Sequence, residues 1–144
     1  REELTTEGGL NLDQESVHKA INKLHKHNLN VCLFVEPNIN IIKKCKELDI
    51  KYIELHTGKY ANLDKNKQNI EVSSIRECAE YAKNQDINCH AGHGLDYDNV
   101  ESIAKISEIK ELNIGHSIVS MSIIEGLENS IKRMIKIINN CRND

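Results

Sequence analysis

The stretch KYIELHTG, residues 51–58, decides the fold of this 144-residue chain. It is rich in the aromatic and apolar residues that favour β-strands, and Glu54 lies between Ile53 and Leu55. The strand signal ends at Thr57-Gly58, after which a polar segment, KYANLDKNK, leads into a long helical pattern. The stretch therefore predicts a strand that carries a carboxylate in its middle and is followed by a helix.

The same order of strand and helix recurs on both sides of this stretch. Further strands are expected at residues 30–36 (NVCLFVE), 87–91 (INCHA) and 111–114 (ELNI). Helices are expected at residues 12–26, from Pro37 to residue 48, around the apolar face of Ile75, Cys78, Ala79 and Ala82, near residues 97–106, and in the C-terminal tail. The chain is thus one helix followed by four strand–helix units, with no sign of an internal domain boundary.

Strands that alternate with helices form parallel sheets with right-handed crossovers. An open flavodoxin-like sheet has this order, and so does a (β/α)8 TIM barrel, of which 144 residues are a little over half because a closed barrel needs ~250 residues. The polar residues favour the barrel, since they follow every strand rather than one switch point. We expect an α/β fold in which residues 1–144 form a single domain, roughly the C-terminal half of a TIM barrel, with the N-terminal half missing.

The composition excludes several classes of protein. The net charge is −3 with both signs interspersed, so no basic surface is expected for nucleic acid or an anionic membrane. No apolar run approaches the ~20 residues of a membrane span and no signal peptide opens the chain, so we expect a cytoplasmic protein. The five cysteines form no CxxC pair and are expected to be reduced. The chain begins at Arg1 rather than Met, which suggests a fragment.

Two side chains near strand ends suit catalysis. Glu54 needs a reason to lie inside an apolar strand because an unpaired buried carboxylate is costly. It would either stabilise a cationic substrate atom or form a structural pair with Arg or Lys. His93 lies between Gly92 and Gly94, where its imidazole can reach a ligand and act as an acid or base near neutral pH. The alternative is that His93 is a surface-loop histidine.

The last strand end suits an anion. Gly115-His116-Ser117 lies between a strand and a helix, where free N–H groups and the helix dipole favour phosphate; the alternative is a tight turn without a ligand. A set of four histidines also raises the possibility of a metal centre: His56, His90, His93 and His116. No HxH or HExxH spacing accompanies them, so we expect no metal.

Four segments together resemble a known family. TTEGGL (residues 5–10), YIELHTGKYA (52–61), AGHGLDYDNV (91–100) and ELNIGHSIV (111–119) are similar, in order and spacing, to the signature segments of the pyridoxine 5′-phosphate synthases. The resemblance implies a (β/α)8 barrel that assembles as a homo-octamer and needs no metal or organic cofactor. It also implies two small phosphorylated substrates, 1-deoxy-D-xylulose 5-phosphate and 3-amino-2-oxopropyl phosphate, which are condensed in vitamin B6 biosynthesis with release of phosphate and water.

The resemblance implies roles for individual residues by their positions in these motifs. Glu54 would stabilise a cationic transition state, and His93 would be the proton donor. The substrate-binding residues would be Thr5, on the deoxyxylulose phosphate, and Gly94, Gly115 and His116, on the aminoketone phosphate. His90 departs from the family pattern, where Asn is expected, and could tune His93. The family's further catalytic histidine, glutamate and substrate-binding arginines belong to the half that this chain lacks.

Two other functions remain open at this stage. A phosphosugar isomerase or epimerase can be built on the same barrel, because a fold does not determine a function. The chain could also be an inactive structural fragment that associates through its open strand edges. We expect the 144-residue piece alone to be inactive, because half of the catalytic residues and phosphate ligands are missing.

Overall fold

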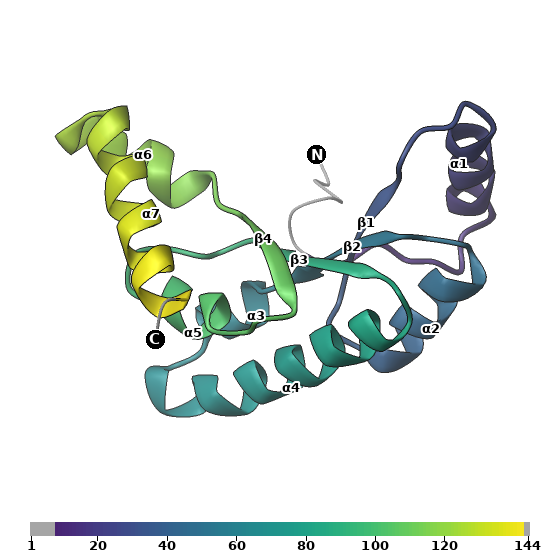
Figure 1. Cartoon of the computed structure of the whole chain (residues 1–144), viewed down its shortest axis with the longest axis horizontal. Helices are drawn as coiled ribbons and strands as arrows, with labels where there is room; N and C mark the ends of the chain where they lie inside the picture. Colours follow the sequence, from purple (N-terminus) through teal and green to yellow (C-terminus); the bar gives the residue numbers. More distant parts are fainter. Residues whose placement is uncertain (1–7, 143–144) are drawn as a thin grey trace.

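The structure, a computed structural model, describes residues 8–142 as an alternation of strands and helices (Figure 1). The strands are β1 (Cys32–Val35), β2 (Tyr52–His56), β3 (Asn88–Gly92) and β4 (Ile109–Asn113). The helices are α1 (Glu15–Lys26), α2 (Ile39–Glu47), α3 (Gly58–Asn62), α4 (Lys65–Asn84), α5 (Val100–Ala104), α6 (His116–Glu125) and α7 (Leu127–Arg142). Within residues 8–142, none of these helices is long and apolar enough to cross a membrane.

The four strands form one parallel sheet in the order β1-β2-β3-β4. Phe34, Glu54 and His90 lie opposite one another on the first three strands. An irregularity between Cys89 and His90 shifts the pairing with β4, after which Gly92 lies opposite Asn113. Because the strands are parallel, their carboxyl ends meet at one edge of the sheet. This order confirms the predicted parallel sheet of half a barrel.

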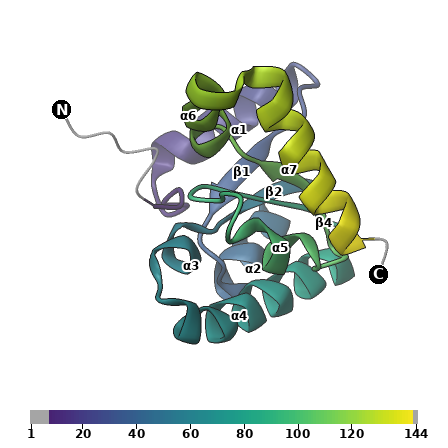
Figure 2. The same ribbon diagram turned by 90° about the vertical axis from the view of Figure 1, so that its left-hand side faces the viewer.

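The sheet buries one face and leaves the other open. Helices α2, α3, α4 and α5 lie on the same side of the sheet, with α4 running along it (Figures 1 and 2). Ile53 and Leu55 of β2 join Ala91 of β3 in the core on that side, together with Ile42 of α2 and Ile75 of α4. The alternate residues of the strands face away from these helices. They form an open surface, which is the side that faces the interior in a closed barrel.

Three helices end in the same way before a strand. Asn28, Asp49 and Asp86, which follow α1, α2 and α4, have φ angles of 56°, 55° and 58°. In each case the next residue is apolar and donates its N–H to a carbonyl in the last turn of the helix, at 3.0–3.2 Å. This is the hydrogen-bond pattern of a Schellman motif, and Asn and Asp tolerate the left-handed backbone better than most side chains. Asn or Asp followed by an apolar residue thus ends each helix and turns the chain back toward the sheet.

Several element boundaries differ from the sequence-based prediction. The first helix begins at Glu15 rather than at residue 12, because the Asp13 N–H donates to Asn11 Oδ1 in a preceding turn. The last strand begins earlier, at Ile109. The polar segment after β2 contains the short helix α3. The segment after β4 forms two helices, separated at Gly126, whose φ is 82°.

The left-handed helix ends predict opposite effects for two substitutions at one exposed position. Asp86→Gly should raise the free energy of unfolding slightly, whereas Asp86→Val should lower it by about 1–2 kcal/mol, because a β-branched side chain clashes with the backbone at positive φ. Urea unfolding of the full-length protein measures both. Gln85→Val, at a residue with φ −98°, is the control and should cost less. Equal losses for the two valine variants would contradict the prediction.

Candidate active site

The carboxyl edge of the sheet borders a cleft of about 800 Å³. The cleft is lined by Phe34 of β1, Glu54 of β2, residues 93–96 after β3 and residues 113–117 at the end of β4. Its size is that of a site for small molecules. Every strand of the sheet or the loop after it therefore contributes to one space, as the barrel prediction requires.

Glu54 lies in this cleft beside an amide side chain. Its Oε2 accepts a hydrogen bond from Asn113 Nδ2 at 2.7 Å, and its Oε1 lies where a Cβ at Gly92 would clash with it. Burial raises the pKa of Glu54, while the hydrogen bond from Asn113 and the nearby His90 act in the opposite direction. Within residues 8–142 the carboxylate pairs with neither Arg nor Lys. The structural ion pair considered from the sequence is thus not formed by the described residues.

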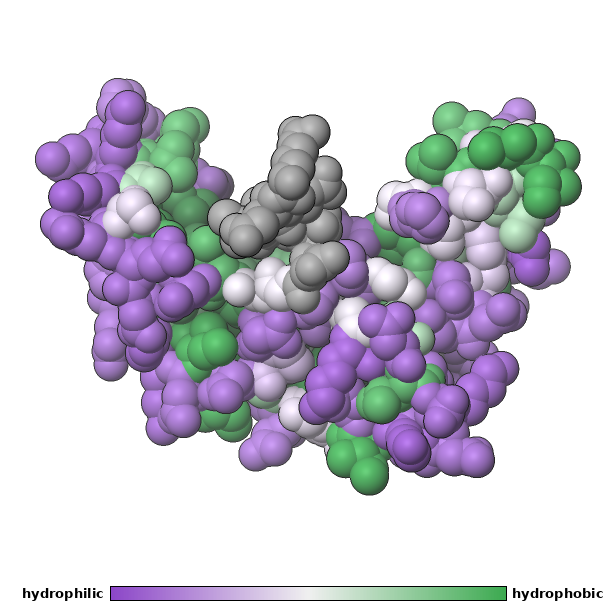
Figure 3. All heavy atoms as spheres, turned by 180° about the vertical axis from the view of Figure 1, so that it is seen from behind, coloured by the Kyte–Doolittle hydropathy of each residue, from purple (hydrophilic) through white to green (hydrophobic). Residues whose placement is uncertain are grey.

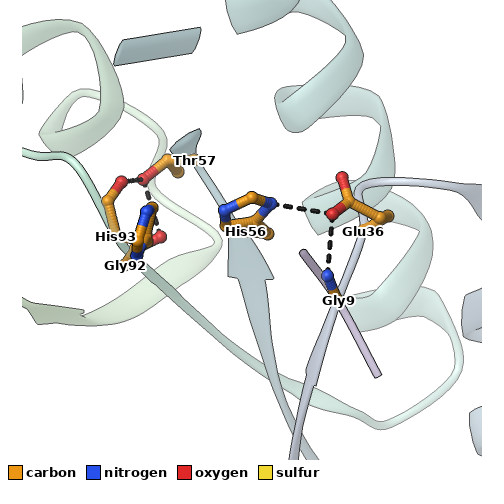
Figure 4. Close-up of polar contacts among 6 residues, drawn as sticks. All are labelled: Gly9, Glu36, His56, Thr57, Gly92 and His93. Atoms are coloured by element: carbon orange, nitrogen blue, oxygen red, sulfur yellow. Dashed lines mark hydrogen bonds and ion pairs between the residues drawn. The ribbon is translucent and has the colours of Figure 1, made fainter. Parts of the chain in front are cut away.

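His93 projects from a loop with an unusual backbone. His93 and Gly94 have φ angles of 79° and 76°, in the left-handed region that only glycine adopts readily. Thr57 Oγ1 donates to the carbonyl oxygens of His93, at 2.6 Å, and Gly92, at 2.8 Å (Figure 4). Asn99 Nδ2 donates to the Gly94 carbonyl at 3.1 Å. The loop is therefore held from two sides, while the side chain of His93 stays exposed at the cleft.

Helix α6 begins at the wall of the cleft. Gly115 precedes its first turn and His116 is its first residue, and no side chain of residues 8–142 caps this end. Ser117 Oγ donates to the Leu95 carbonyl at 2.8 Å, which ties the helix start to the loop that carries His93. Free N–H groups at the start of a ten-residue helix favour an anion. The sequence-based prediction of a phosphate site thus falls on a helix start that borders the cleft, and it stays a prediction.

A pair formed by the buried imidazole of His56 and the partly exposed carboxylate of Glu36 lies next to His93. Glu36 Oε1 accepts from His56 Nδ1 at 2.7 Å and from the Gly9 N–H at 2.8 Å (Figure 4). An ionised carboxylate only accepts, so this contact needs a proton on His56 Nδ1. The His56 ring is 4.9 Å from the His93 ring and 5.0 Å from that of Phe34, between centroids. His56 is only 6% exposed, and its Nε2 has no hydrogen-bond partner among the described residues.

The structure brings together most of the residues predicted to form the site. Five line the cleft: Glu54, His93, Gly94, Gly115 and His116. Thr5 lies outside the described residues. Four further residues at or near the site were not among those predicted from the sequence: Glu36, Thr57, Asn99 and Asn113. Glu36 and Asn113 satisfy the criterion used for the others, a polar residue at the end of a strand, and applying that criterion to every strand would have found them.

The histidines considered for a metal centre do not form one among the described residues. In residues 8–142, no group of three or more His, Cys, Asp or Glu side chains is arranged to hold a metal ion. His90 lies opposite Glu54 in the sheet, and its Nδ1 is 3.8 Å from Glu111 Oε1. Its charge acts on Glu54. The structure therefore links this departure from the family pattern to Glu54, in addition to any effect on His93.

The family model and the curated relatives that match this chain point to the same family. The family described as "Pyridoxal phosphate biosynthesis protein PdxJ" matches residues 1–140. The pyridoxine 5′-phosphate synthase of Ehrlichia ruminantium (strain Welgevonden) is 46% identical over 142 residues, which are 97% of this chain and 58% of the relative. The enzyme of the same name from Prochlorococcus marinus (strain MIT 9211) is 42% identical over 99% of this chain and 59% of the relative. That of Campylobacter lari is 42% identical over 96% and 64%.

The chain thus spans somewhat more than half the length of these curated relatives. The match runs through all four strand–helix units of the sheet and includes every segment that lines the cleft. On this match, the chain belongs to the PdxJ family of pyridoxal phosphate biosynthesis proteins.

Proposed function

We propose that the protein containing this chain is a pyridoxine 5′-phosphate synthase. It condenses 1-deoxy-D-xylulose 5-phosphate with 3-amino-2-oxopropyl phosphate to give pyridoxine 5′-phosphate, phosphate and water. The observation that carries the proposal is the single cleft that unites Glu54, His93 and the start of α6. The family of the chain and the names of its relatives support the same reaction. The remaining strands of the barrel supply the rest of the site.

The condensation needs an acid and a stabilised cation. When an amine joins a ketone, the carbonyl oxygen leaves as water and an iminium cation forms, so the departing oxygen needs a proton. His93 is the proposed proton donor, because its exposed imidazole stands at the cleft on a loop held by Thr57 and Asn99. Glu54 is the proposed stabiliser of the cation, because its carboxylate lies in the same cleft without an Arg or Lys partner among the described residues.

The substrates are held through their phosphates in this proposal. Gly115 and His116 bind the phosphate of the aminoketone at the start of α6, where backbone N–H groups are free, and Gly94 closes the same side. Thr5 binds the phosphate of the deoxyxylulose, a role that rests on its motif alone. The proposed reaction uses no metal ion and no organic cofactor.

The proposal extends to the assembly. The chain forms one barrel domain with the rest of the protein, which works in the cytoplasm as a homo-oligomer, an octamer by family resemblance. Association is supported by an apolar surface on α6 and the start of α7, visible at the upper right of Figure 3. Its exposed side chains are Val119, Ile123, Ile124 and Leu127, and that of Ile123 is 84% exposed. Apolar surfaces of this kind mark protein contacts.

The reaction is tested with the full-length protein and both substrates. Phosphate release and the absorbance of the product should appear only when both substrates are present. A phosphosugar isomerase or epimerase would instead convert one phosphosugar without the aminoketone. Conversion of the deoxyxylulose phosphate alone would therefore replace the synthase proposal with the isomerase.

Loss of the proposed proton donor should act on turnover rather than on binding. His93→Asn should lower kcat by about 10²–10⁴-fold and leave KM for both substrates within a fewfold, since a general acid acts in the transition state. Steady-state kinetics of the full-length protein measure this. His27→Asn, at an exposed position next to α1, is the matched control. If His93→Asn keeps more than about a third of kcat, His93 is a loop residue and not the donor.

Gly115 offers a separate test of the phosphate site. A Cβ at this position meets no atom of the described residues within 4 Å and the φ angle is −115°, so a side chain there fits the described part of the fold. Gly115→Val should therefore leave stability nearly unchanged and mainly raise KM for the aminoketone phosphate, because it obstructs substrate and transition state alike. Unchanged KM in a folded Gly115→Val variant would place the phosphate elsewhere.

A further inference from the structure

The backbone at His93 poses a physical problem for an acid catalyst. A side chain with a Cβ is unfavourable at φ 79°, and such a conformation persists only where the surrounding structure holds it. A proton donor also has to stay within hydrogen-bond reach of the departing oxygen, so a small displacement of its loop lowers the rate. Some part of the protein must therefore hold His93 in this conformation.

We propose that Thr57 is the positioning residue for His93, and that His56 assists it by supporting the imidazole ring. The proposal rests on the proposed function in one respect, because it takes His93 to be the proton donor. Thr57 and His56 are adjacent at the end of β2, the strand that pairs with the one preceding His93. One short segment thus holds both the backbone and the ring of His93.

Thr57 holds the backbone through two groups. Its N–H donates to the Gly92 carbonyl at 2.8 Å and extends the pairing of β2 with β3 by one bond. Its hydroxyl donates to the carbonyl oxygens of Gly92 and His93, at 2.8 and 2.6 Å, and shares one proton between them (Figure 4). The contact thus spans the peptide that enters the left-handed turn. Removing the hydroxyl would leave the His93 carbonyl without this donor.

His56 packs against the imidazole ring of His93. Glu36 binds one nitrogen of His56, which orients the imidazole, and the ring lies 4.9 Å from that of His93 at an interplanar angle of 54°. Gly58 leaves room for the two rings. A Cβ at Gly58 would lie 2.5 Å from His56 Nε2 and 2.8 Å from His93 Cδ2. In the segment His56-Thr57-Gly58, the ring of His56 therefore packs against that of His93, the hydroxyl of Thr57 binds the His93 carbonyl, and the missing side chain of Gly58 leaves space for both rings.

Burial decides that these residues act through His93 and not on the substrate. Thr57 is 0% exposed, and the free nitrogen of His56 is enclosed by protein atoms. Neither residue lines the cleft, whereas His93 does. Plain packing is the competing explanation, and it makes a different prediction: valine has nearly the shape of threonine, so packing alone would be kept in Thr57→Val.

The kinetic test uses the full-length protein with Thr57→Val, Thr57→Ser and Ile75→Val. Thr57→Val should lower kcat at least tenfold while KM for both substrates changes less than threefold. Thr57→Ser keeps the hydroxyl, so its kcat should stay within threefold of the wild-type value. Ile75→Val, a change in the buried core on the helix-covered side of the sheet, controls for loss of stability and should keep kcat. Equal loss in the serine and valine variants would overturn the proposal.

A double substitution separates positioning from a general structural role. A residue that acts only through the His93 imidazole has nothing to position once that imidazole is gone. In a His93→Asn background, Thr57→Val should therefore lower kcat by less than twofold. A further tenfold loss in that background would show that Thr57 acts by another route.

Hydrogen exchange tests the same inference without reference to the reaction. In the full-length protein without substrate, Thr57→Val should speed amide exchange across residues 92–96 at least tenfold, and Thr57→Ser and Ile75→Val should not. Unchanged exchange in Thr57→Val would overturn the positioning role even if the enzyme proved to be a synthase. Conversely, a wild-type protein that fails to condense the two substrates would refute the proposed function, and exchange would still decide whether Thr57 holds His93.

Discussion

The parallel pairing of β2 with β3 is the interaction on which the candidate site depends. It runs in register from Tyr52 opposite Asn88 to His56 opposite Gly92, and the Thr57 N–H continues it by one hydrogen bond. This register sets Glu54 beside His90 and brings the residues after β2 against the loop that follows β3. A shift by one residue would turn Glu54 toward the helices and Ile53 toward the cleft, because side chains alternate along a strand. The burial of Ile53 and Leu55 on the helix-covered face therefore also directs the carboxylate of Glu54 toward the cleft.

The site contains several arrangements that a structure built only for stability would avoid. Glu54 is partly buried beside the amide of Asn113, with neither Arg nor Lys as a partner among the described residues. His93 has a left-handed backbone, and His56 keeps a buried nitrogen without a partner among the described residues. Each carries a free-energy cost, and costs of this kind collect at functional sites. The three lie on the open face of the sheet, toward the carboxyl ends of the strands. The helix-covered face is an apolar core. Function and stability thus occupy different faces of the same strands.

Much of the fold and part of the site could be predicted from local patterns. The four strands and the helices between them follow from the alternation of apolar runs and turn residues, and the parallel order follows from the helical crossovers. The ends of α1, α2 and α4 could also have been predicted, since Asn or Asp before Leu or Ile recurs at all three. Glu36 and Asn113 could have been selected as strand-end residues. Thr57 could not have been assigned its contact with His93, because the two are 36 residues apart and only the strand register brings them together.

By itself, the sequence determined the family, the order of the elements and the candidate site residues, because motifs and periodicity are local properties of a chain. The tertiary structure decided which of these residues meet. It gave Glu54 the amide of Asn113 as its partner, it placed His90 beside Glu54, and it set His56 between Glu36 and His93. The physical reason is that register, burial and the left-handed turn at His93 arise from contacts between strands that are distant in sequence, and no local pattern encodes those contacts.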